Sequence, residues 1–282
     1  MVEVLKTGLY DTIQDIGRFG VQKYGIPFSG VMDLQSATIS NTVLGNSISD
    51  SILEITMTGP KLLFHCDIEI ALAGADLSPK INSKTIKMNT RIHVTKNDIL
   101  TFGKRNYGSR AYLAVKGGFQ TEYYMNSYSM YGTLTKQSKL IKGDQLLISE
   151  VSDAYENINA SIKIDKTHFN VSEIKVFKGM EFNCLSKIEQ NTLLSTKFTI
   201  SKDSNRMAYH VNETLENTIE PIITSLVLPG TVQLTPSGKL MILMRDCQTT
   251  GGYPRILQVS EAAINHLSQK GFGEKFRLKC ID

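Results

Sequence analysis

The stretch KLLFHCDIEIAL, residues 61–72, decides the fold class of this chain. Two short apolar runs, residues 61–64 and 68–72, are separated by a break at Asp67, and runs of this length bounded by turn residues are typical of β-strands. Similar runs recur at residues 99–102, 111–115, 146–148 and 240–244. The chain is therefore predicted to be mainly β, of the barrel or sandwich type.

Helical patterns are few. The best covers residues 31–44, where apolar residues recur at helical spacing and Gly45 stands where a left-handed C-terminal cap is expected. A second follows Ser260, a suitable N-cap, and extends to Gly271. The sequence predicts short helices at these two places.

A weak internal repeat indicates two similar units. A turn that leads into a strand recurs as KNDIL at residues 96–100, KGDQL at 142–146 and FGEKF at 272–276. The polar stretch at residues 152–166 is the best candidate boundary between the units. In a chain of 282 residues we expect one domain over residues 1–155 and a second over residues 156–282.

Composition excludes several classes of protein. Apolar residues make up 41% of the chain and charged residues 21%, which is ordinary for a packed globular protein. The net charge of +4 is spread thinly, so we expect no nucleic-acid partner. No apolar run suits a membrane helix and no signal peptide is recognised, which predicts a cytoplasmic protein without membrane contact. The spacing of the five histidines and four cysteines predicts no metal site and four free thiols.

The most unusual segment is DTIQDIGRFGVQKYGIPFSGVMD, residues 11–33. Its glycines allow positive φ and close approach of the backbone to a small group. If Gly30 precedes a helix that starts at Val31, the first N–H groups of that helix would form an anion or carbonyl site together with Arg18 and Ser29, with Asp33 nearby. A structural loop that only closes the end of a barrel is an equally good interpretation.

A second polar segment is RDCQTTGGYP, residues 245–254, which follows the apolar run 240–244. Polar side chains at the end of a strand are rarely needed for packing. Gln248 can donate to a carbonyl and accept from an N–H, and Asp246 can act as a base. We expect an amide-binding lip that also includes Thr249, Thr250, Gly251, Gly252 and Tyr253. The alternative is a turn in which the glycine pair supplies only flexibility.

Arg206, in the polar turn SNRMAY at residues 204–209, could hold a substrate carboxylate with two hydrogen bonds. Such an arginine is more often a solvated surface group or the partner of a nearby acid. Cys247 has no evident histidine partner and is predicted to be a small buried residue instead of a nucleophile. The chain also lacks a G-x-x-x-x-G-K-[ST] sequence, so any ATP is expected to bind to another subunit or an atypical site.

Together these segments resemble the allophanate hydrolase subunit 2 family, also called the KipA-like family, to which the C subunits of 5-oxoprolinases belong. Its pattern runs roughly as TTVQDxGRxGxxxxGVPxSGAMD near the N-terminus and ADRQTTGGYP near the C-terminus. Further blocks resemble it in the same order: NTVLGN at residues 41–46, LEITMTGPKLLF at 53–64, GSRAYLAVKGG at 108–118, SNRMAY at 204–209 and PGTVQLTP at 229–236. One departure is NSYSM at residues 126–130, where the family tends to show a GSRST-like block.

The resemblance implies a fold of two tandem cyclophilin-like β-barrel domains with a few short helices. It implies three possible functions. The favoured one is the C subunit of an ATP-dependent 5-oxoprolinase, an enzyme that opens the lactam 5-oxoproline to glutamate and in which the A and B subunits are partners. The second is a biotin-dependent carboxyltransferase acting on urea or a related amide, with carboxybiotin, biotin carboxylase and a biotin carrier protein as partners. The third is a regulator that antagonises a KipI-like inhibitor of a sensor kinase.

For the enzymatic functions we expect one small polar pocket built from both glycine-bearing stretches. Backbone N–H groups at Gly30 and Val31, assisted by Arg18, would polarise an amide carbonyl. Asp246 and Gln248 would orient the amide nitrogen or a water, and Arg206 would receive any carboxylate.

Overall fold

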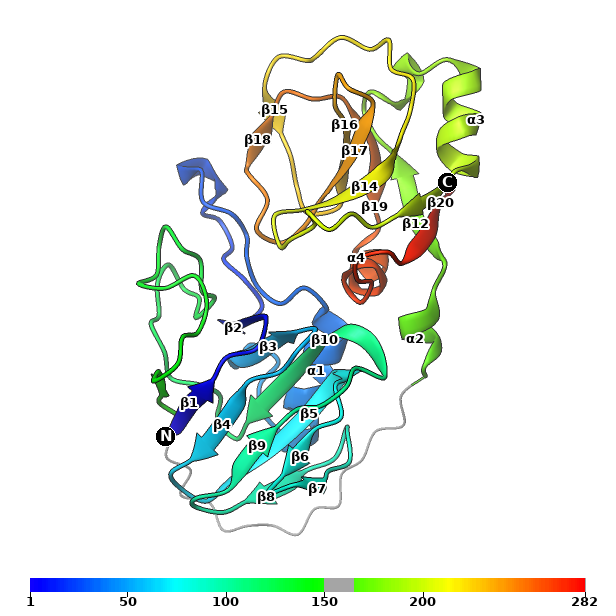
Figure 1. Ribbon diagram of the computed structural model, residues 1–282. Helices are drawn as coiled ribbons and strands as arrows, with labels where there is room; N and C mark the ends of the chain where they lie inside the picture. Colours follow the sequence, from blue (N-terminus) through cyan, green and yellow to red (C-terminus); the bar gives the residue numbers. More distant parts are fainter. Residues whose placement is uncertain (150–164, 282) are drawn as a thin grey trace. The chain divides into compact units, whose positions relative to one another are not determined.

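The computed structural model describes residues 1–149 and 165–281, and these residues form two compact units that are mainly β. The first unit contains residues 1–18 and 29–166, and the second contains residues 19–28 and 167–282 (Figure 1). The polar stretch at 152–166 lies outside the described residues except for its last two positions. A domain boundary at residue 155 therefore stays a prediction.

Two antiparallel sheets build the first unit. The six-stranded sheet has the order β11 (Gln145–Leu146), β1 (Val2–Lys6), β4 (Lys61–Phe64), β9 (Ile99–Thr101), β6 (Lys80–Ile81) and β7 (Lys84–Thr85). The five-stranded sheet has the order β2 (Tyr10–Gln14), β3 (Ile52–Thr56), β10 (Tyr107–Val115), β5 (Ile68–Asp76) and β8 (Ile92–Val94).

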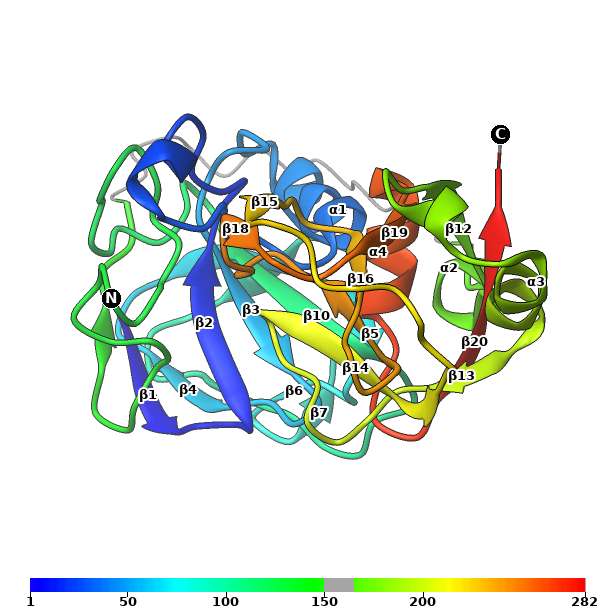
Figure 2. The ribbon, with the colours of Figure 1, turned by 90° about the horizontal axis from the view of Figure 1, so that it is seen from above.

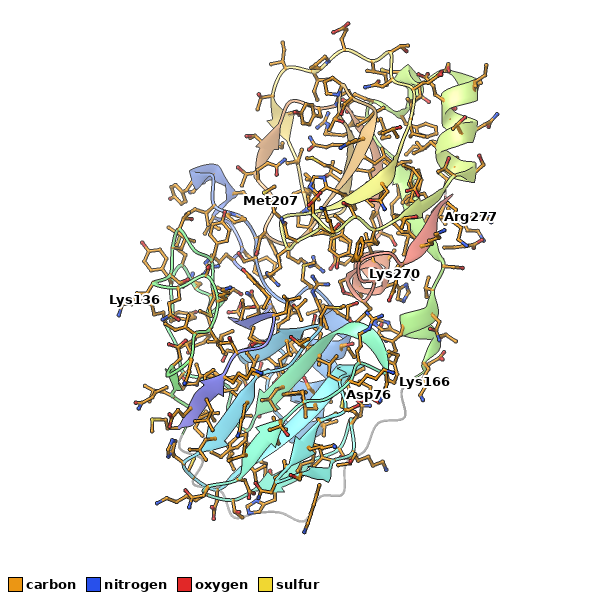
Figure 3. The ribbon with its side chains drawn as sticks, in the orientation of Figure 1. Asp76, Lys136, Lys166, Met207, Lys270 and Arg277 are labelled. Atoms are coloured by element: carbon orange, nitrogen blue, oxygen red, sulfur yellow. The ribbon has the colours of Figure 1, made fainter. Side chains whose placement is uncertain are left out.

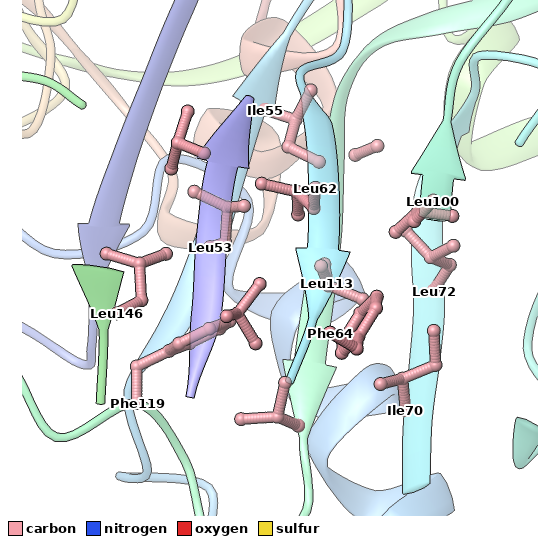
Figure 4. Close-up of a cluster of buried hydrophobic side chains, with 14 of the residues drawn as sticks. Leu53, Ile55, Leu62, Phe64, Ile70, Leu72, Leu100, Leu113, Phe119 and Leu146 are labelled. Carbon is pink, nitrogen blue, oxygen red and sulfur yellow. The ribbon is translucent and has the colours of Figure 1, made fainter. Parts of the chain in front are cut away.

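The central strand β10 is covered on both faces. Leu113 and Val115 join the large apolar cluster that also contains residues of β4 (Figure 4). Tyr112 and Ala114 alternate with them and pack in the cluster that contains residues of helix α1 (Leu34–Leu44). Because successive side chains of a strand point to opposite faces, this continuous buried run places one set in the main core and the other under the helix.

The second unit contains a nearly closed, barrel-like sheet. Its order is β13 (Lys197–Thr199), β20 (Lys275–Cys280), β12 (Glu173–Lys178), β19 (Arg255–Val259), β16 (Thr231–Leu234), β17 (Lys239–Leu243) and β14 (Ala208–Thr214). Among the described strands of this sheet, β12 and β20 are the pair that runs parallel. A bridge between Ile200 and Val211 connects the end of β13 to β14, so the first and last strands meet.

Short elements complete the second unit. Strands β15 (Ser225–Leu226) and β18 (Thr250–Gly251) form a separate ribbon. The helices are η1 (Gln22–Tyr24), α2 (Thr167–Asn170), η2 (Phe182–Cys184), α3 (Lys187–Ser195) and α4 (Glu261–Ser268). Helix α3 lies beside β20 in Figure 2. Buried Lys270 follows the C-terminal end of α4 (Figure 3).

Most elements predicted from the sequence are confirmed. The strand at 61–64 is β4, and each of the three recurrent turns leads into a strand: β9, β11 and β20. The helix predicted at 31–44 ends at Leu44 with Gly45 in a left-handed cap, but it begins at Leu34. Its start at Val31 was wrong because Asp33 caps the helix, accepting a hydrogen bond from the Ser36 N–H.

The second predicted helix begins after Ser260, which caps it through the Ala263 N–H, as expected. It ends at Ser268 with Gln269 as C-cap, so its predicted end at Gly271 was wrong. All four cysteines are free thiols. Within residues 1–149 and 165–281, every helix is too short or too polar to cross a membrane.

Candidate functional site

Asp15 fixes the glycine-bearing loop that follows β2. Its buried carboxylate accepts hydrogen bonds from the hydroxyls of Ser127 at 2.7 Å and Ser129 at 2.6 Å. It also accepts from the backbone N–H groups of Tyr128 at 2.6 Å and Gly17 at 2.8 Å. Hydrogen bonds to an ionised acceptor are stronger than those between neutral groups. The carboxylate therefore ties two segments far apart in the sequence into one rigid piece.

Arg18 strengthens the same connection. Its side chain is fully buried, and Nε donates to the carbonyl of Tyr124 at 3.3 Å while a terminal nitrogen donates to the carbonyl of Ser129. A guanidinium offers five donors in a fixed plane, which suits several carbonyls at once. In this structure Arg18 shapes the backbone of residues 124–129.

Gly30 lies where only glycine fits. Its φ is +83°, and an added Cβ would lie 2.8 Å from the nitrogen and 2.9 Å from the Cα of Gly17. Both values are shorter than real Cβ contacts, and the positive φ disfavours any other residue. Next to it, the Val31 N–H donates to the carbonyl of Asp15 at 2.9 Å. That donor is already used within the protein, so the expected polarisation of a substrate carbonyl by Val31 needs this bond to open.

Ser29 has an unusual conformation. It adopts a positive φ of 56° and is fully buried, and its hydroxyl has no hydrogen-bond partner among the described residues. Non-glycine residues in this region of φ cluster at functional sites. Ser29 therefore keeps its place among the candidate ligand-binding residues.

Sequence reasoning missed Glu54, which supports the loop together with Tyr112. The Glu54 carboxylate accepts from the Met32 N–H at 2.7 Å and from the Tyr112 hydroxyl at 2.9 Å. The same hydroxyl accepts from the Asp33 N–H at 2.8 Å. Burial and the neighbouring Glu54 and Asp33 charges hold the pKa of Tyr112 well above its usual value, so it is a hydroxyl donor. The available signal was a glutamate and a tyrosine inside otherwise apolar strands.

In the second unit, Arg206 and Asp246 bind each other. Nε and a terminal nitrogen of Arg206 donate to the two carboxylate oxygens of Asp246 at 2.8 Å and 3.1 Å. Their side chains are only 5% and 11% exposed, and the Asp246 N–H donates to the Arg206 carbonyl. The sequence allowed for an arginine paired with a nearby acid, and this is what the structure contains. The pair anchors the start of the 245–254 loop.

Three other residues of this loop, Gln248, Gly251 and Tyr253, contact a buried glutamine, Gln233 of β16. Nε2 of Gln248 donates to its amide oxygen at 3.4 Å, and its own amide nitrogen donates to the carbonyl of Tyr253 at 3.4 Å. An added Cβ on Gly251 would lie 2.6 Å from that nitrogen. Gly251 is therefore needed for a close approach to Gln233.

The rest of the loop forms a ribbon edge. Thr250 and Gly251 make up β18, while the Thr249 and Gly252 carbonyls accept from the N–H groups of Val227 and Ile222. Thr250 is exposed and Tyr253 is 37% exposed. Backbone groups of this segment thus hold the ribbon together, and part of its side chains faces outward.

A cavity of about 500 Å³ lies in the second unit beside the start of α4. Its walls are mainly apolar, and its polar residues include Arg245 and Glu261, which form an ion pair, and Gln258. The volume lies in the range typical of small-molecule sites. The apolar lining residues are Phe19, Phe28, Phe177, Leu228, Pro229 and Val259.

Cys247 is a packing residue. It lies in an apolar cluster with Ala208, Val227 and Leu243. Burial raises the pKa of its thiol to about 12, with Asp246 adding to the effect. A thiol with such a pKa carries almost no thiolate at neutral pH, which fits the predicted role. Within the described part of the chain, no three His, Cys, Asp or Glu side chains gather in a way that could hold a metal ion.

The glycine-bearing stretches belong largely to different units, because Arg18 and residues 29–33 lie in the first and residues 245–254 in the second. Each is rigidly held within its own unit by the bonds above. Their union in one pocket stays a prediction.

Comparison with known proteins decides the family. The model of the family described as carboxyltransferase domain, subdomain A and B, matches residues 24–280. The chain belongs to this family. The resemblance inferred from the motifs is thereby confirmed. Over 97% of its length it is 31% identical to the C subunit of 5-oxoprolinase from Escherichia coli, covering 89% of that protein. It is 28% identical to the Haemophilus influenzae protein of the same name, covering 91% of it.

The sequence match to the urea amidolyases covers less than half of this chain, whereas the structural match covers all of it. The Lachancea kluyveri urea amidolyase is 40% identical over 46% of this chain, which corresponds to 7% of that protein. The solved structure of K. lactis urea amidolyase superposes on the whole chain with a TM-score of 0.90 at 26% identity, and this chain spans 19% of it. Other solved structures, at 23% identity and a TM-score of 0.89, share the fold and are about half covered by this chain.

Two departures from the family pattern acquire a structural meaning. The segment at 126–130, which lacks the arginine of the GSRST-like block, supplies the serines that bind Asp15. Aligned with the family pattern ADRQTTGGYP, this chain has Arg245 in place of the alanine.

Proposed function

We propose that this chain is the C subunit of a 5-oxoprolinase complex, in which ATP-dependent opening of 5-oxoproline gives glutamate. The observation that supports this most is its similarity to two 5-oxoprolinase C subunits over nearly the full length of all three proteins. Matches to urea amidolyases cover under half of this chain in sequence. A full-length match outweighs a partial one of somewhat higher identity.

The fold we assign is two tandem cyclophilin-like β-barrel domains, over residues 1–155 and 156–282. The closed connectivity of the seven-stranded sheet supports a barrel in the second half. In the first half, two antiparallel sheets that share one apolar core support a related arrangement. We place a protein of this type in the cytoplasm.

For the site we propose that Gln248 orients the substrate amide, together with Thr249, Thr250, Gly251, Gly252 and Tyr253. Asp246 acts on the amide nitrogen or a water while Arg206 holds it in position. In the first unit we propose Ser29, Gly30, Val31 and Asp33 as substrate-binding residues, and Arg18 acts by fixing their loop through residues 124–129. These roles use the carboxylate, amide and hydroxyl groups that the two loops provide.

Partner subunits are part of this proposal. The relatives are named as one subunit of a larger enzyme, so we assign the A and B subunits, the latter KipI-like, as partners of this chain. ATP is assigned to a partner because this sequence lacks a phosphate-binding P-loop.

The test is co-expression with the partner subunits, followed by measurement of phosphate and glutamate. We expect both products in equal amounts when ATP and 5-oxoproline are present, and none when urea replaces 5-oxoproline. Omission of this chain should abolish the activity. Release of phosphate without any need for this chain would refute the proposal.

A second function has its own support. The family is described by its carboxyltransferase domains, and the fold matches K. lactis urea amidolyase with a TM-score of 0.90. A biotin-dependent transfer of carboxyl to urea or a related amide would then need carboxybiotin on a carrier protein and a biotin carboxylase. Activity with urea, bicarbonate and a biotinylated carrier, and none with 5-oxoproline, would favour this alternative.

A further inference from the structure

We propose that the cavity beside α4 binds a small organic carboxylate that carries a flat ring, and that Arg245 receives the carboxylate in exchange for Glu261. None of its lining residues is one of those assigned to the proposed amide site, although Arg245 directly precedes Asp246, and all of them belong to the second unit.

The Arg245 guanidinium is buried and Glu261 is not. The arginine side chain is 7% exposed, whereas the glutamate side chain that pairs with it is 63% exposed. One terminal nitrogen of Arg245 donates to Glu261 Oε2 at 3.3 Å and the other donates to Oε1. A buried cation needs an anionic partner, but an exposed glutamate contributes little of its own to holding the pair closed. Another carboxylate can replace it without changing the charge balance.

The arginine also has an unused donor. Its Nε is buried and has no hydrogen-bond partner among the described residues. A carboxylate can accept from Nε and a terminal nitrogen side by side, which is the preferred geometry of an arginine–carboxylate pair. Glu261 uses only the two terminal nitrogens, so a ligand can offer a better fit than the side chain it displaces.

The walls select a flat ring. Phe19 and Phe28 pack edge to face, with ring centroids 4.6 Å apart, and both line the cavity with Phe177. Phe19 is 62% exposed, which is unusual for so large an apolar side chain. Aromatic rings bind a flat ligand through faces and edges and gain burial when it is present. A ring-bearing ligand explains why these side chains remain partly uncovered.

Gln258 makes the polar wall rigid. Its Nε2 donates to the Pro229 carbonyl at 2.8 Å, and its Oε1 accepts from the Thr231 hydroxyl at 2.9 Å. A side chain held at both ends does not move into the cavity when the ligand is absent. The movable group at the site is therefore Glu261.

Two sources of such a ligand share this chemistry: the lactam acid 5-oxoproline and an aromatic acid such as benzoate. Binding of both to the full-length chain is measured by calorimetry, beside the neutral analogues 2-pyrrolidinone and benzamide. The variants are Glu261→Ala and Arg245→Gln, with Glu173→Ala as the matched control because it removes an exposed, paired glutamate elsewhere in the second unit.

We expect Glu261→Ala to bind the carboxylates about tenfold more tightly, because it removes the competing carboxylate, and Arg245→Gln to weaken binding about tenfold or more. Neither variant should change binding of the neutral analogues, and Glu173→Ala should match wild type. The acid whose affinity gains more in Glu261→Ala identifies the source. Equal affinities of wild type and Glu261→Ala for both acids would overturn the proposal.

If Arg245→Gln folds poorly, Glu261→Ala still tests the proposed exchange of carboxylates at Arg245, because damage to the fold cannot raise the affinity for a ligand. Thermal unfolding gives a second readout, since a ligand that binds the native state raises its midpoint more in Glu261→Ala than in wild type. The result is separate from the proposed function: these measurements use neither ATP nor partners, whereas the 5-oxoprolinase assay requires both.

Discussion

Asp246 and Arg206 are joined by two side-chain hydrogen bonds of 2.8 and 3.1 Å, in a position where both side chains are nearly inaccessible to water. The pair combines a residue that the proposed chemistry needs with the residue that keeps it in place. Its disruption should affect both activity and stability, and the two effects can be measured separately.

Asp246→Asn should lower kcat for 5-oxoproline-dependent phosphate release by about 10²-fold, because an amide cannot accept a proton. It should also lower the free energy of unfolding by about 3 kcal/mol, since Arg206 then carries a buried charge without its anionic partner. Denaturant titration measures the second effect and steady-state kinetics the first. Unchanged turnover by the folded variant would favour a regulatory function for this chain.

Gly251→Ala should lower the free energy of unfolding by about 1–3 kcal/mol, the usual cost of overpacking. The new Cβ would lie 2.6 Å from the amide nitrogen of Gln233. Gly252→Ala is the matched control, because its Cβ would have its nearest contact at 3.4 Å. The double variant Gly251→Ala/Gln233→Ser should recover part of the loss, and equal effects of the two alanine substitutions would contradict this account.

Gly30→Ala should be more harmful than Gly20→Ala. Both glycines have positive φ, so both substitutions carry a backbone cost of about 1 kcal/mol. Only Gly30 also places its Cβ against Gly17, at 2.8 Å, while nothing lies within 4 Å of the Cβ at Gly20. The difference in melting temperature between the two variants measures the cost of the clash with Gly17. Similar melting temperatures would show that residues 17 and 30 are not in close contact.

Asp11 should make stability fall as the pH rises from 4 to 6.5. Burial raises the pKa of this carboxyl from 3.8 to about 6. Below pH 3.8 the Asp11 carboxyl is protonated in both the unfolded and the native state. Between pH 3.8 and about 6 the native state holds this proton more tightly than the unfolded state does. The stabilisation that comes from the bound proton is therefore lost as the pH rises through 6. Asp11→Asn should remove about 2 kcal/mol of this dependence. Parallel pH profiles of the two proteins would show that Asp11 does not titrate in this range.

Local patterns in the sequence predicted the elements well. The apolar runs at 61–64 and 240–244 and the cap at Gly45 are short-range features, and short-range physics determines them. Contacts between distant residues were beyond such reasoning. The sequence around Asp15 and Arg18 does not indicate that both residues bind the segment 124–129. Similarly, whether Arg206 is solvated or paired could be decided only from the position of Asp246 in the structure.

The sequence identified the polar residues of the candidate site by their type, but it did not predict the hydrogen bonds that they make within the protein. Val31 and Arg18 were expected to face a ligand, whereas the Val31 N–H and two of the three guanidinium nitrogens of Arg18 donate to protein carbonyls. Glu54 was overlooked because it lies in an apolar strand, and its role is seen only from contacts such as those with Met32 and Tyr112. The cytoplasmic location and the assignment of ATP to a partner stay predictions.

Residues 19–28 belong to the second unit although both flanking segments belong to the first. The polypeptide therefore enters the C-terminal body twice, once near its beginning and once after residue 166. A fragment that starts at residue 167 would lack Phe19 and Phe28, two of the aromatic walls of its own cavity. A single cut near residue 166 therefore leaves the second unit without residues 19–28. A complete fragment of the second unit would need residues 19–28 added as a separate peptide or joined to it by a linker.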